Sequence, residues 1–108
     1  MAARYNIIFD ESASTDLANI QSYLSTARSE AFAEDFVTRI VRHCQTFRTI
    51  PHRGTRLNVD GVSLRTVSWR GSVTIAFKVF DNERNVRVLG VFYRGRDVRA
   101  ALRKRLED

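Results

Sequence analysis

The sequence contains very few of the residues that cross-link small domains or bind metals. It has one cysteine, one proline and two histidines among 108 residues. The single Cys44 cannot form an internal disulfide, so a disulfide framework is excluded and a reducing cytoplasm is the simplest location. One cysteine and two histidines also provide no cluster of ligands at the spacings of known metal sites. We therefore expect no metal and no cofactor.

Long apolar runs are missing as well. The first residues have no apolar core of signal-peptide length, and no segment approaches the ~18 to 20 apolar residues that cross a membrane. Gly90 and Gly95 fit neither glycine-rich pattern that holds nucleotide phosphates. The chain is thus expected to be neither secreted nor membrane-embedded. With 108 residues, no repeat and no linker, residues 1–108 are expected to form one domain.

Lysine is scarce, whereas arginine supplies sixteen of the eighteen basic residues. Residues 1–54 carry six basic and six acidic side chains, but residues 55–108 carry twelve basic and six acidic ones. The whole excess of positive charge therefore lies in the second half. Because arginine binds carboxylate and phosphate in a bidentate way, this half is a candidate surface for an acidic partner. The alternative is a solvated surface in a chain whose arginine content reflects GC-rich coding.

The first half predicts a strand followed by two amphipathic helices. Residues 4–9 are apolar and β-prone, and Asp10 follows them as a helix N-cap. Helical spacing then relates Ala13, Leu17, Ile20, Leu24 and Ala27, and the polar Asp16 falls off this stripe. A second stripe contains Phe32, Phe36, Ile40, Cys44 and Phe47. Pro51 ends it, so the two helices form an αα-hairpin whose apolar faces need a sheet.

The second half predicts that sheet. Residues 52–56 form a polar connector, and residues 62–69, 73–79 and 86–93 are strands of an antiparallel meander. After Asp97, apolar residues at helical spacing predict a last short helix with Val98, Ala101, Leu102 and Leu106 on one face. The order β-α-α-β-β-β-α describes an α/β (α+β) fold in which the αα-hairpin packs on the meander.

This order, together with several local sequence words, resembles the ParE/RelE superfamily of bacterial toxins. The words lie at Ala13 through Asp16-Leu17 to Ile20 and Tyr23-Leu24, at Phe36 to Ile40, at Ile50-Pro51-His52-Arg53-Gly54, at Val62 to Arg65, at Ile75 to Val79 and at Val88 to Asp97. None is diagnostic alone, but their order and spacing are specific to the superfamily. The ending Val91-Phe92-Tyr93-Arg94-Gly95-Arg96-Asp97 looks more like the ParE branch than the RelE branch.

The resemblance implies the toxin component of a type II toxin-antitoxin module. ParE-like members act on DNA gyrase, stabilise its cleaved-DNA state and are neutralised by a ParD-like antitoxin whose C-terminal part wraps the toxin. On this interpretation the chain works by binding, has no catalytic residues and reaches operator DNA only through its antitoxin.

Two alternatives stay open. RelE-like members are ribosome-dependent endonucleases that cut mRNA, and Arg65, Arg94 and Arg96 could stand at their basic positions. However, Thr74 occupies the place of a central arginine, the last helix has no tyrosine, and neither His43 nor His52 has a neighbour that marks it as a general base. The second alternative is a basic binding module without toxicity, for which no helix-turn-helix or RNA-binding sheet motif is found.

The candidate partner-binding residues are arginines, aromatic residues and one leucine of the second half. Aromatic and arginine side chains dominate the binding energy of many interfaces. Trp69 fits a core position equally well, and Leu102 packs on the sheet unless the last helix rearranges on binding. Arg70 is a further candidate of the same kind. The predicted set is Arg65, Trp69, Arg87, Tyr93, Arg94, Arg96 and Leu102.

Overall fold

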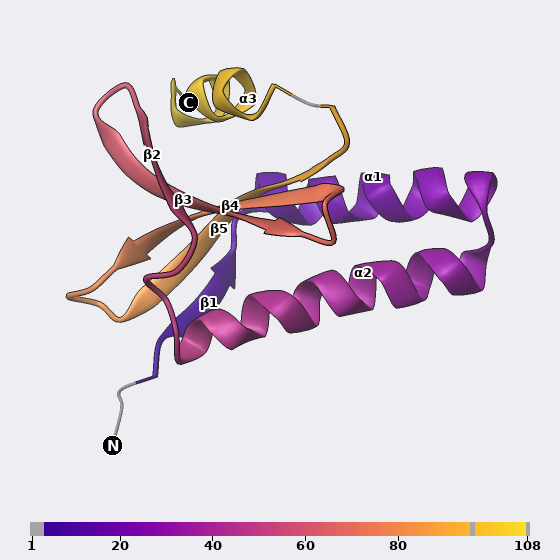
Figure 1. Cartoon of the computed structure of the whole chain (residues 1–108), viewed down its shortest axis with the longest axis horizontal. Helices are drawn as coiled ribbons and strands as arrows, with labels where there is room; N and C mark the ends of the chain where they lie inside the picture. Colours follow the sequence, from indigo (N-terminus) through magenta and orange to yellow (C-terminus); the bar gives the residue numbers. More distant parts are fainter. Residues whose placement is uncertain (1–3, 96, 108) are drawn as a thin grey trace.

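The computed structural model describes residues 4–95 and 97–107, which form a five-stranded sheet with helices on both faces (Figure 1). In chain order the elements are β1 (Asn6–Phe9), α1 (Glu11–Ala27), α2 (Glu30–Gln45), the 3-10 turn η1 (Thr46–Arg48), β2 (Thr55–Val59), β3 (Val62–Trp69), β4 (Val73–Phe80), β5 (Asn85–Tyr93) and α3 (Val98–Glu107). The predicted α+β fold, with its N-terminal strand, αα-hairpin, meander and last helix, is confirmed.

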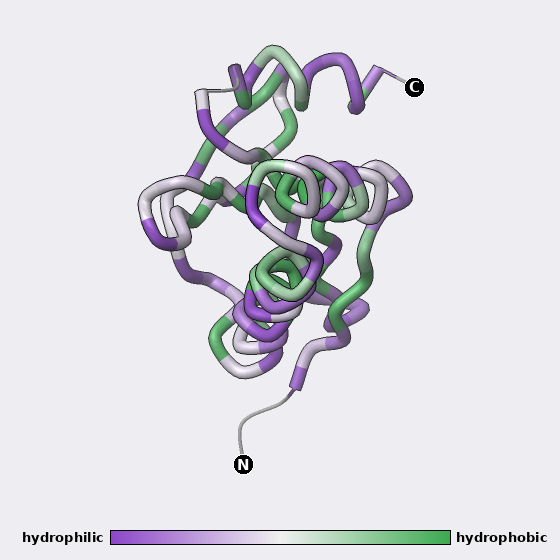
Figure 2. The backbone as a smooth tube through the Cα atoms, turned by 90° about the vertical axis from the view of Figure 1, so that its right-hand side faces the viewer, coloured by the Kyte–Doolittle hydropathy of each residue, from purple (hydrophilic) through white to green (hydrophobic). Residues whose placement is uncertain are grey.

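Both long helices begin at the side-chain caps that the sequence provides. The Asp10 carboxylate accepts hydrogen bonds from the Ser12 backbone N–H at 3.4 Å and from the Ser12 hydroxyl at 2.8 Å. Ser29 caps α2 by accepting from the Phe32 N–H at 3.0 Å. These caps satisfy donors that a helix leaves unpaired in its first turn. Figure 2 looks along both helices and shows hydrophobic residues recurring among hydrophilic ones.

The strand order in the sheet is β1-β5-β4-β3-β2. Strands β2 to β5 are antiparallel neighbours, whereas β1 lies parallel to β5, with Asn6 opposite Asn85 and Phe9 opposite Val88. The parallel pairing places the start of α1 beside the middle of β5. A β-bulge between Ala76 and Phe77 shifts the register of the β4–β5 pair.

The expectation of a polar connector at 52–56 followed by three antiparallel strands was wrong in one respect. Residues Thr55–Val59 form β2, which pairs with β3 and makes the meander four-stranded. The hairpin turns at Asp60 and Gly61, whose φ values of +48° and +85° suit a two-residue β-hairpin turn. Gly54 enters β2 with φ +82°, and a Cβ there would collide with the backbone of Thr66. A β-strand this short and polar gives little hydrophobic signal.

The two faces of the sheet bury two separate hydrophobic clusters. Helices α1 and α2 cover the first cluster, in which Phe47 stacks on Phe77 with ring centroids 4.5 Å apart. Cys44 is fully buried in this cluster, as expected, and burial raises the pKa of its thiol to about 12. Helix α3 covers the second cluster on the opposite face, which consists of Val59, Leu64, Ala76, Phe92 and Leu102.

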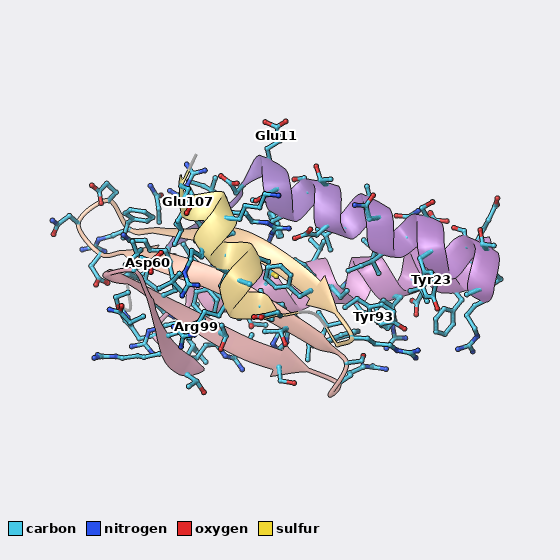
Figure 3. The ribbon with its side chains drawn as sticks, turned by 90° about the horizontal axis from the view of Figure 1, so that it is seen from above. Glu11, Tyr23, Asp60, Tyr93, Arg99 and Glu107 are labelled. Carbon is cyan, nitrogen blue, oxygen red and sulfur yellow. The ribbon has the colours of Figure 1, made fainter. Side chains whose placement is uncertain are left out.

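Exposed polar contacts connect α3 to the β2 hairpin (Figure 3). Arg99 donates to the Asn58 carbonyl at 2.6 Å, and Arg103 forms an ion pair with Asp60 at 3.2 Å. Within the described residues, no helix combines the length and apolar character needed to cross a membrane.

Candidate partner-binding surface

An aromatic cluster lies where β3 ends, β4 begins and β5 ends. The register places Trp69 and Tyr93 on either side of Val73, so both rings stand at the same end of the sheet. Phe36 of α2 packs edge-on against both, with centroid distances of 5.2 Å to Trp69 and 5.8 Å to Tyr93. Tyr23 of α1 lies 6.1 Å from Tyr93 and remains 55% exposed (Figure 3). We call this end of the molecule the aromatic end.

A groove of about 150 Å³ runs from the aromatic end along the boundary between α1 and β5. Strand β1 pairs with β5 through Val88 and no further, so the outer edge of β5 beyond Val88 faces α1 instead of a strand. Side chains of α1 bind this edge. The Ser12 hydroxyl donates to the Leu89 carbonyl at 2.8 Å. The groove is lined by Asp16, Asn19, Ile20, Tyr23, Val91 and Tyr93.

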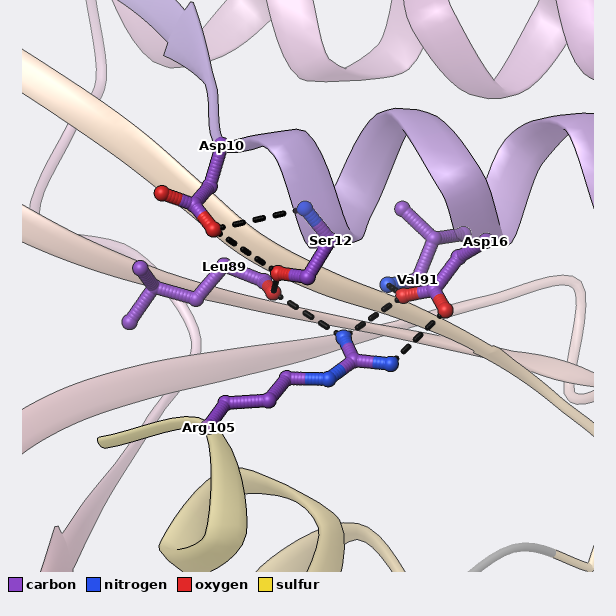
Figure 4. A network of polar contacts seen from close by, with 6 residues as sticks. All are labelled: Asp10, Ser12, Asp16, Leu89, Val91 and Arg105. Carbon is purple, nitrogen blue, oxygen red and sulfur yellow. Dashed lines mark hydrogen bonds and ion pairs between the residues drawn. The ribbon is translucent and has the colours of Figure 1, made fainter. Parts of the chain in front are cut away.

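Asp16, which lines the groove, pairs with Arg105, and this contact joins the two faces of the sheet (Figure 4). Arg105 of α3 donates from Nη1 to Asp16 Oδ2 at 2.7 Å and from Nη2 to Oδ1 at 2.8 Å. Its Nη1 also reaches the Leu89 carbonyl at 3.0 Å, while Asp16 accepts the Val91 N–H at 2.9 Å. The guanidinium therefore satisfies a carboxylate that is 7% exposed and a carbonyl of the β5 edge. We call this pair the Asp16–Arg105 clamp.

The placement of Asp16 off the apolar stripe of α1 was wrong, because the residue is buried in the described structure. A signal was present in the sequence. Asp16 follows Ala13 by three positions and precedes Ile20 by four, which puts it on the same helix face. A carboxylate on a buried face needs a charged or hydrogen-bonding partner, but nothing local identifies Arg105, 89 positions away.

Two arginines stand beside the aromatic end. The Cζ atom of Arg70 lies 4.9 Å from the Trp69 ring centroid, and that of Arg94 lies 5.0 Å from the Tyr93 centroid. Such contacts hold a guanidinium over an aromatic face without neutralising its charge. Both arginines are exposed and both have positive φ, +53° and +48°, which is uncommon for residues other than glycine.

The other predicted partner-binding residues lie elsewhere or are buried. Arg65 is opposite Phe77 on β4, four positions or roughly 13 Å along the strand from Val73 at the aromatic end. Arg87 forms an ion pair with Asp10 at 3.2 Å. Leu102 is fully buried between α3, to which it belongs, and the opposite face of the sheet, and Trp69 is 8% exposed. Arg96 lies outside the described residues. The structure thus brings together Trp69, Arg70, Tyr93 and Arg94, and adds Tyr23, which the sequence analysis did not select.

The groups considered for chemistry are dispersed. Burial lowers the pKa of His43, whose ring stands edge-on to Phe47 at 5.8 Å. The buried Cys44 is a thiol at neutral pH because its pKa is raised to about 12. Thr74 lies opposite Ser68 and Phe92, where the nuclease pattern has an arginine. His52 does have an acidic neighbour, since its Nε2 lies 2.8 Å from Asp81 Oδ1, a contact across 29 positions that the sequence did not reveal.

Comparison with known proteins decides the family. The model of the ParE toxin of type II parDE toxin-antitoxin systems matches residues 7–98, from β1 through the aromatic end to the first residue of α3. The chain belongs to the ParE toxin family. No curated protein matches the sequence of this ParE toxin.

Solved structures agree on the fold of this ParE toxin. It matches a chain of the chromosomal ParDE system from P. aeruginosa with a TM-score of 0.71 and 17% identity, over 83% of this chain and 96% of the other. It also matches a chain of the toxin-antitoxin complex RelBE2 from Mycobacterium tuberculosis with a TM-score of 0.65 and 17% identity, over 87% and 95%. At such identity the likeness concerns the fold, which both branches share.

Proposed function

We propose that this ParE toxin inhibits DNA gyrase and is neutralised by a ParD-like antitoxin that covers the aromatic end and the adjoining groove. The family assignment over residues 7–98 supports a toxin with an antitoxin partner. The aromatic end supports action by binding, because it presents exposed tyrosine and arginine without an arranged nucleophile or base. The proposal places the toxin in the cytoplasm and gives it access to operator DNA through the antitoxin.

The observation that carries the proposed antitoxin site is the contact of the exposed Tyr23 with the half-buried Tyr93 at the mouth of the groove, with the exposed Arg94 beside it. Tyrosine and arginine are enriched among residues that dominate interface energies. The edge of β5 beyond Val88 lies along the same groove. An extended peptide with apolar and acidic side chains would fit a groove flanked by tyrosines and a guanidinium.

The target is tested with a supercoiling and DNA-cleavage assay of gyrase and a parallel assay of mRNA cleavage on programmed ribosomes. We expect the purified toxin to inhibit supercoiling and to trap cleaved DNA, and we expect intact mRNA. Cleaved mRNA with unaffected gyrase would contradict the proposal and support the RelE-like alternative. Inactivity in both assays would contradict the gyrase proposal as well.

The antitoxin site is tested with Tyr23→Ala combined with Arg94→Ala. Truncating two such residues is expected to weaken antitoxin binding at least about 30-fold, which corresponds to roughly 2 kcal/mol. Binding is measured by calorimetry with the ParD-like antitoxin. The matched control is Arg39→Ala with Ser22→Ala, two exposed positions on α2 and α1 outside the lining of the groove. Equal affinity of the test and control variants would move the antitoxin site elsewhere.

A further inference from the structure

A second polar cavity lies on the α1/α2 face of the sheet, at the end opposite to the aromatic end. Its volume is about 280 Å³, and it is found where η1 has ended and the chain turns into β2. Neither the proposed gyrase target nor the proposed antitoxin site uses it. We call it the arginine pocket. It is lined by His52, Arg56, Ser63, Arg65, Lys78, Val79 and Asp81.

The strand register brings two arginines to directly opposed positions beside this pocket, the exposed Arg56 and the half-buried Arg65. Arg56 of β2 is directly opposite Arg65 of β3, and Arg65 is in turn opposite Phe77. Side chains at directly opposed positions are about 5 Å apart at Cβ, and like charges there destabilise the strand pair. Within residues 4–95 and 97–107, neither arginine has a carboxylate within ion-pair distance. Like charges at opposed positions disfavour each other, and an anion between the two arginines would relieve that repulsion.

Among the residues that the structure describes, the one carboxylate that lines the pocket belongs to Asp81 and is engaged by other groups. Asp81 Oδ1 accepts a hydrogen bond from the Tyr5 hydroxyl at 2.7 Å, and the same oxygen lies 2.8 Å from His52 Nε2. The Tyr5 bond is the main reason why the pKa of Asp81 is lowered, with smaller contributions from His52 and Arg65. Asp81 therefore remains an anion near neutral pH, but it holds Tyr5 and His52 in place. Against this single negative charge the pocket has Arg56, Arg65 and Lys78.

The number of hydrogen-bond donors and positive charges at the pocket favours one kind of anion. Two arginines can each donate two parallel hydrogen bonds, and the Ser63 hydroxyl adds another donor at the same cavity. A side-chain carboxylate has two oxygens and one charge, which is too few for this set. A phosphate group presents more oxygens to a planar guanidinium and can carry up to two charges. A cavity of about 280 Å³ lies just below the usual range for drug-sized ligands and is large enough for a phosphate with the atoms next to it.

We propose that the arginine pocket is a phosphate-binding site, with Arg56 and Arg65 as its main ligands. The phosphate could be supplied by a DNA backbone or by a free nucleotide, because both present the same group to the two arginines. This proposal does not depend on gyrase being the target.

The experiment is a calorimetric titration of the full chain at low salt with inorganic phosphate, deoxyadenosine 5′-monophosphate and a short DNA duplex. We expect Arg56→Ala with Arg65→Ala to weaken binding of the preferred probe at least tenfold. The control is Arg39→Ala with Arg42→Ala, which removes the same charge from exposed positions of α2. The control variant should bind within about twofold of the wild type, because its charges lie outside the pocket.

The probes separate the two sources of phosphate. If the source is a DNA backbone, the duplex binds more tightly than the nucleotide, and the double variant reduces the slope of log affinity against log salt by about 2. If the source is a nucleotide, the monophosphate binds at least as well as the duplex and the same variant abolishes its binding. The absence of binding to all three probes, or an equal loss in the control variant, overturns the proposal. An acidic peptide titrated in the same way serves as a fourth probe, and tighter binding of this peptide than of the phosphate probes overturns the proposal as well.

A second measurement, of thermal unfolding midpoints, distinguishes phosphate binding from a purely structural role of the arginines. In phosphate-free buffer, Arg56→Ala is expected to keep or raise the thermal midpoint, because it removes the repulsion from Arg65. Adding phosphate should raise the midpoint of the wild type and leave that of Arg56→Ala nearly unchanged. A variant that is destabilised equally with and without phosphate would show a structural role and contradict the proposal.

Discussion

The two faces of the sheet are held by different forces. On the face covered by α1 and α2, two helices of 17 and 16 residues bury a continuous cluster that includes the stacked rings of Phe47 and Phe77. On the other face, the ten-residue α3 packs its own buried Leu102 against four buried residues of the sheet. There the Asp16–Arg105 clamp and two exposed contacts to the β2 hairpin supplement a small apolar area.

The difference indicates how substitutions on each face should affect stability. Burial of apolar surface is spread over many residues and needs no particular geometry beyond close packing. A buried ion pair depends on two groups, and removing one leaves the other charged and poorly solvated. We therefore expect the α1/α2 face to set global stability, and the α3 face to undock locally at a lower free energy.

The largest effect is expected for Phe47→Ala on the α1/α2 face. Removing a fully buried ring that stacks on Phe77 should lower the free energy of unfolding by about 3–5 kcal/mol. Urea titrations are followed by circular dichroism and by the fluorescence of the single Trp69, and both unfolding midpoints should shift to lower urea by the same amount. The control is Ile50→Ala, which truncates a side chain that is 57% exposed and should cost less than about 0.5 kcal/mol. Similar losses in both variants would contradict the assignment of the main core.

A smaller and more local effect is expected for Arg105→Ala. Breaking a buried pair costs about 3–5 kcal/mol, but undocking of α3 lets water reach Asp16, so we expect about 2 kcal/mol. Amide hydrogen exchange should accelerate throughout α3 and remain slow in α1 and α2. Lys104→Ala, at an exposed neighbouring position, serves as the control and should leave exchange unchanged. Equal acceleration in all three helices would show that the two faces unfold as one unit.

The smallest effect is expected for Asp10→Ala at the start of α1. Loss of this N-cap should cost about 1 kcal/mol at pH 7. The hydrogen bond from the Ser12 hydroxyl is the main reason why the pKa of Asp10 is lowered in the folded protein. A lowered pKa stabilises the fold above the unfolded value of about 4, and this contribution disappears as pH falls through the folded value. Unfolding free energies of variant and wild type should therefore converge in acid, and a constant difference would contradict this origin.

Local patterns in the sequence were sufficient to predict most elements of the fold. Stripes such as Ala13 to Leu24 and Phe32 to Phe47 predicted both long helices, and alternation along residues 73–79 predicted β4. Strand β2 was missed because Leu57 and Val59 alone alternate within a polar segment. The parallel pairing of β1 with β5 could not be predicted, because nothing in residues 6–9 specifies a partner so distant in the chain.

The candidate surface was also predictable only in part, because local patterns indicate neighbouring strand ends but not distant tertiary contacts. Trp69, Arg70, Tyr93 and Arg94 are brought together by neighbouring strand ends, which the meander implies. Tyr23 joins them through the packing of α1 on β5, which is a tertiary contact without a local signal. The opposed pair of Arg56 and Arg65 required the register of a β-strand that was not recognised.

The position of β1 at the edge of the sheet has a consequence for synthesis of the chain. Its neighbour in the described sheet is β5, and 76 positions separate Phe9 from Asn85. At translation rates of about 5–20 residues per second, β5 follows β1 after roughly 4 to 15 s. During that interval the nascent chain carries an apolar strand whose backbone lacks its native partner, a species exposed to premature association. Among the paired strands of the described sheet, Ile7 to Phe9 therefore waits longest during translation for its native partner.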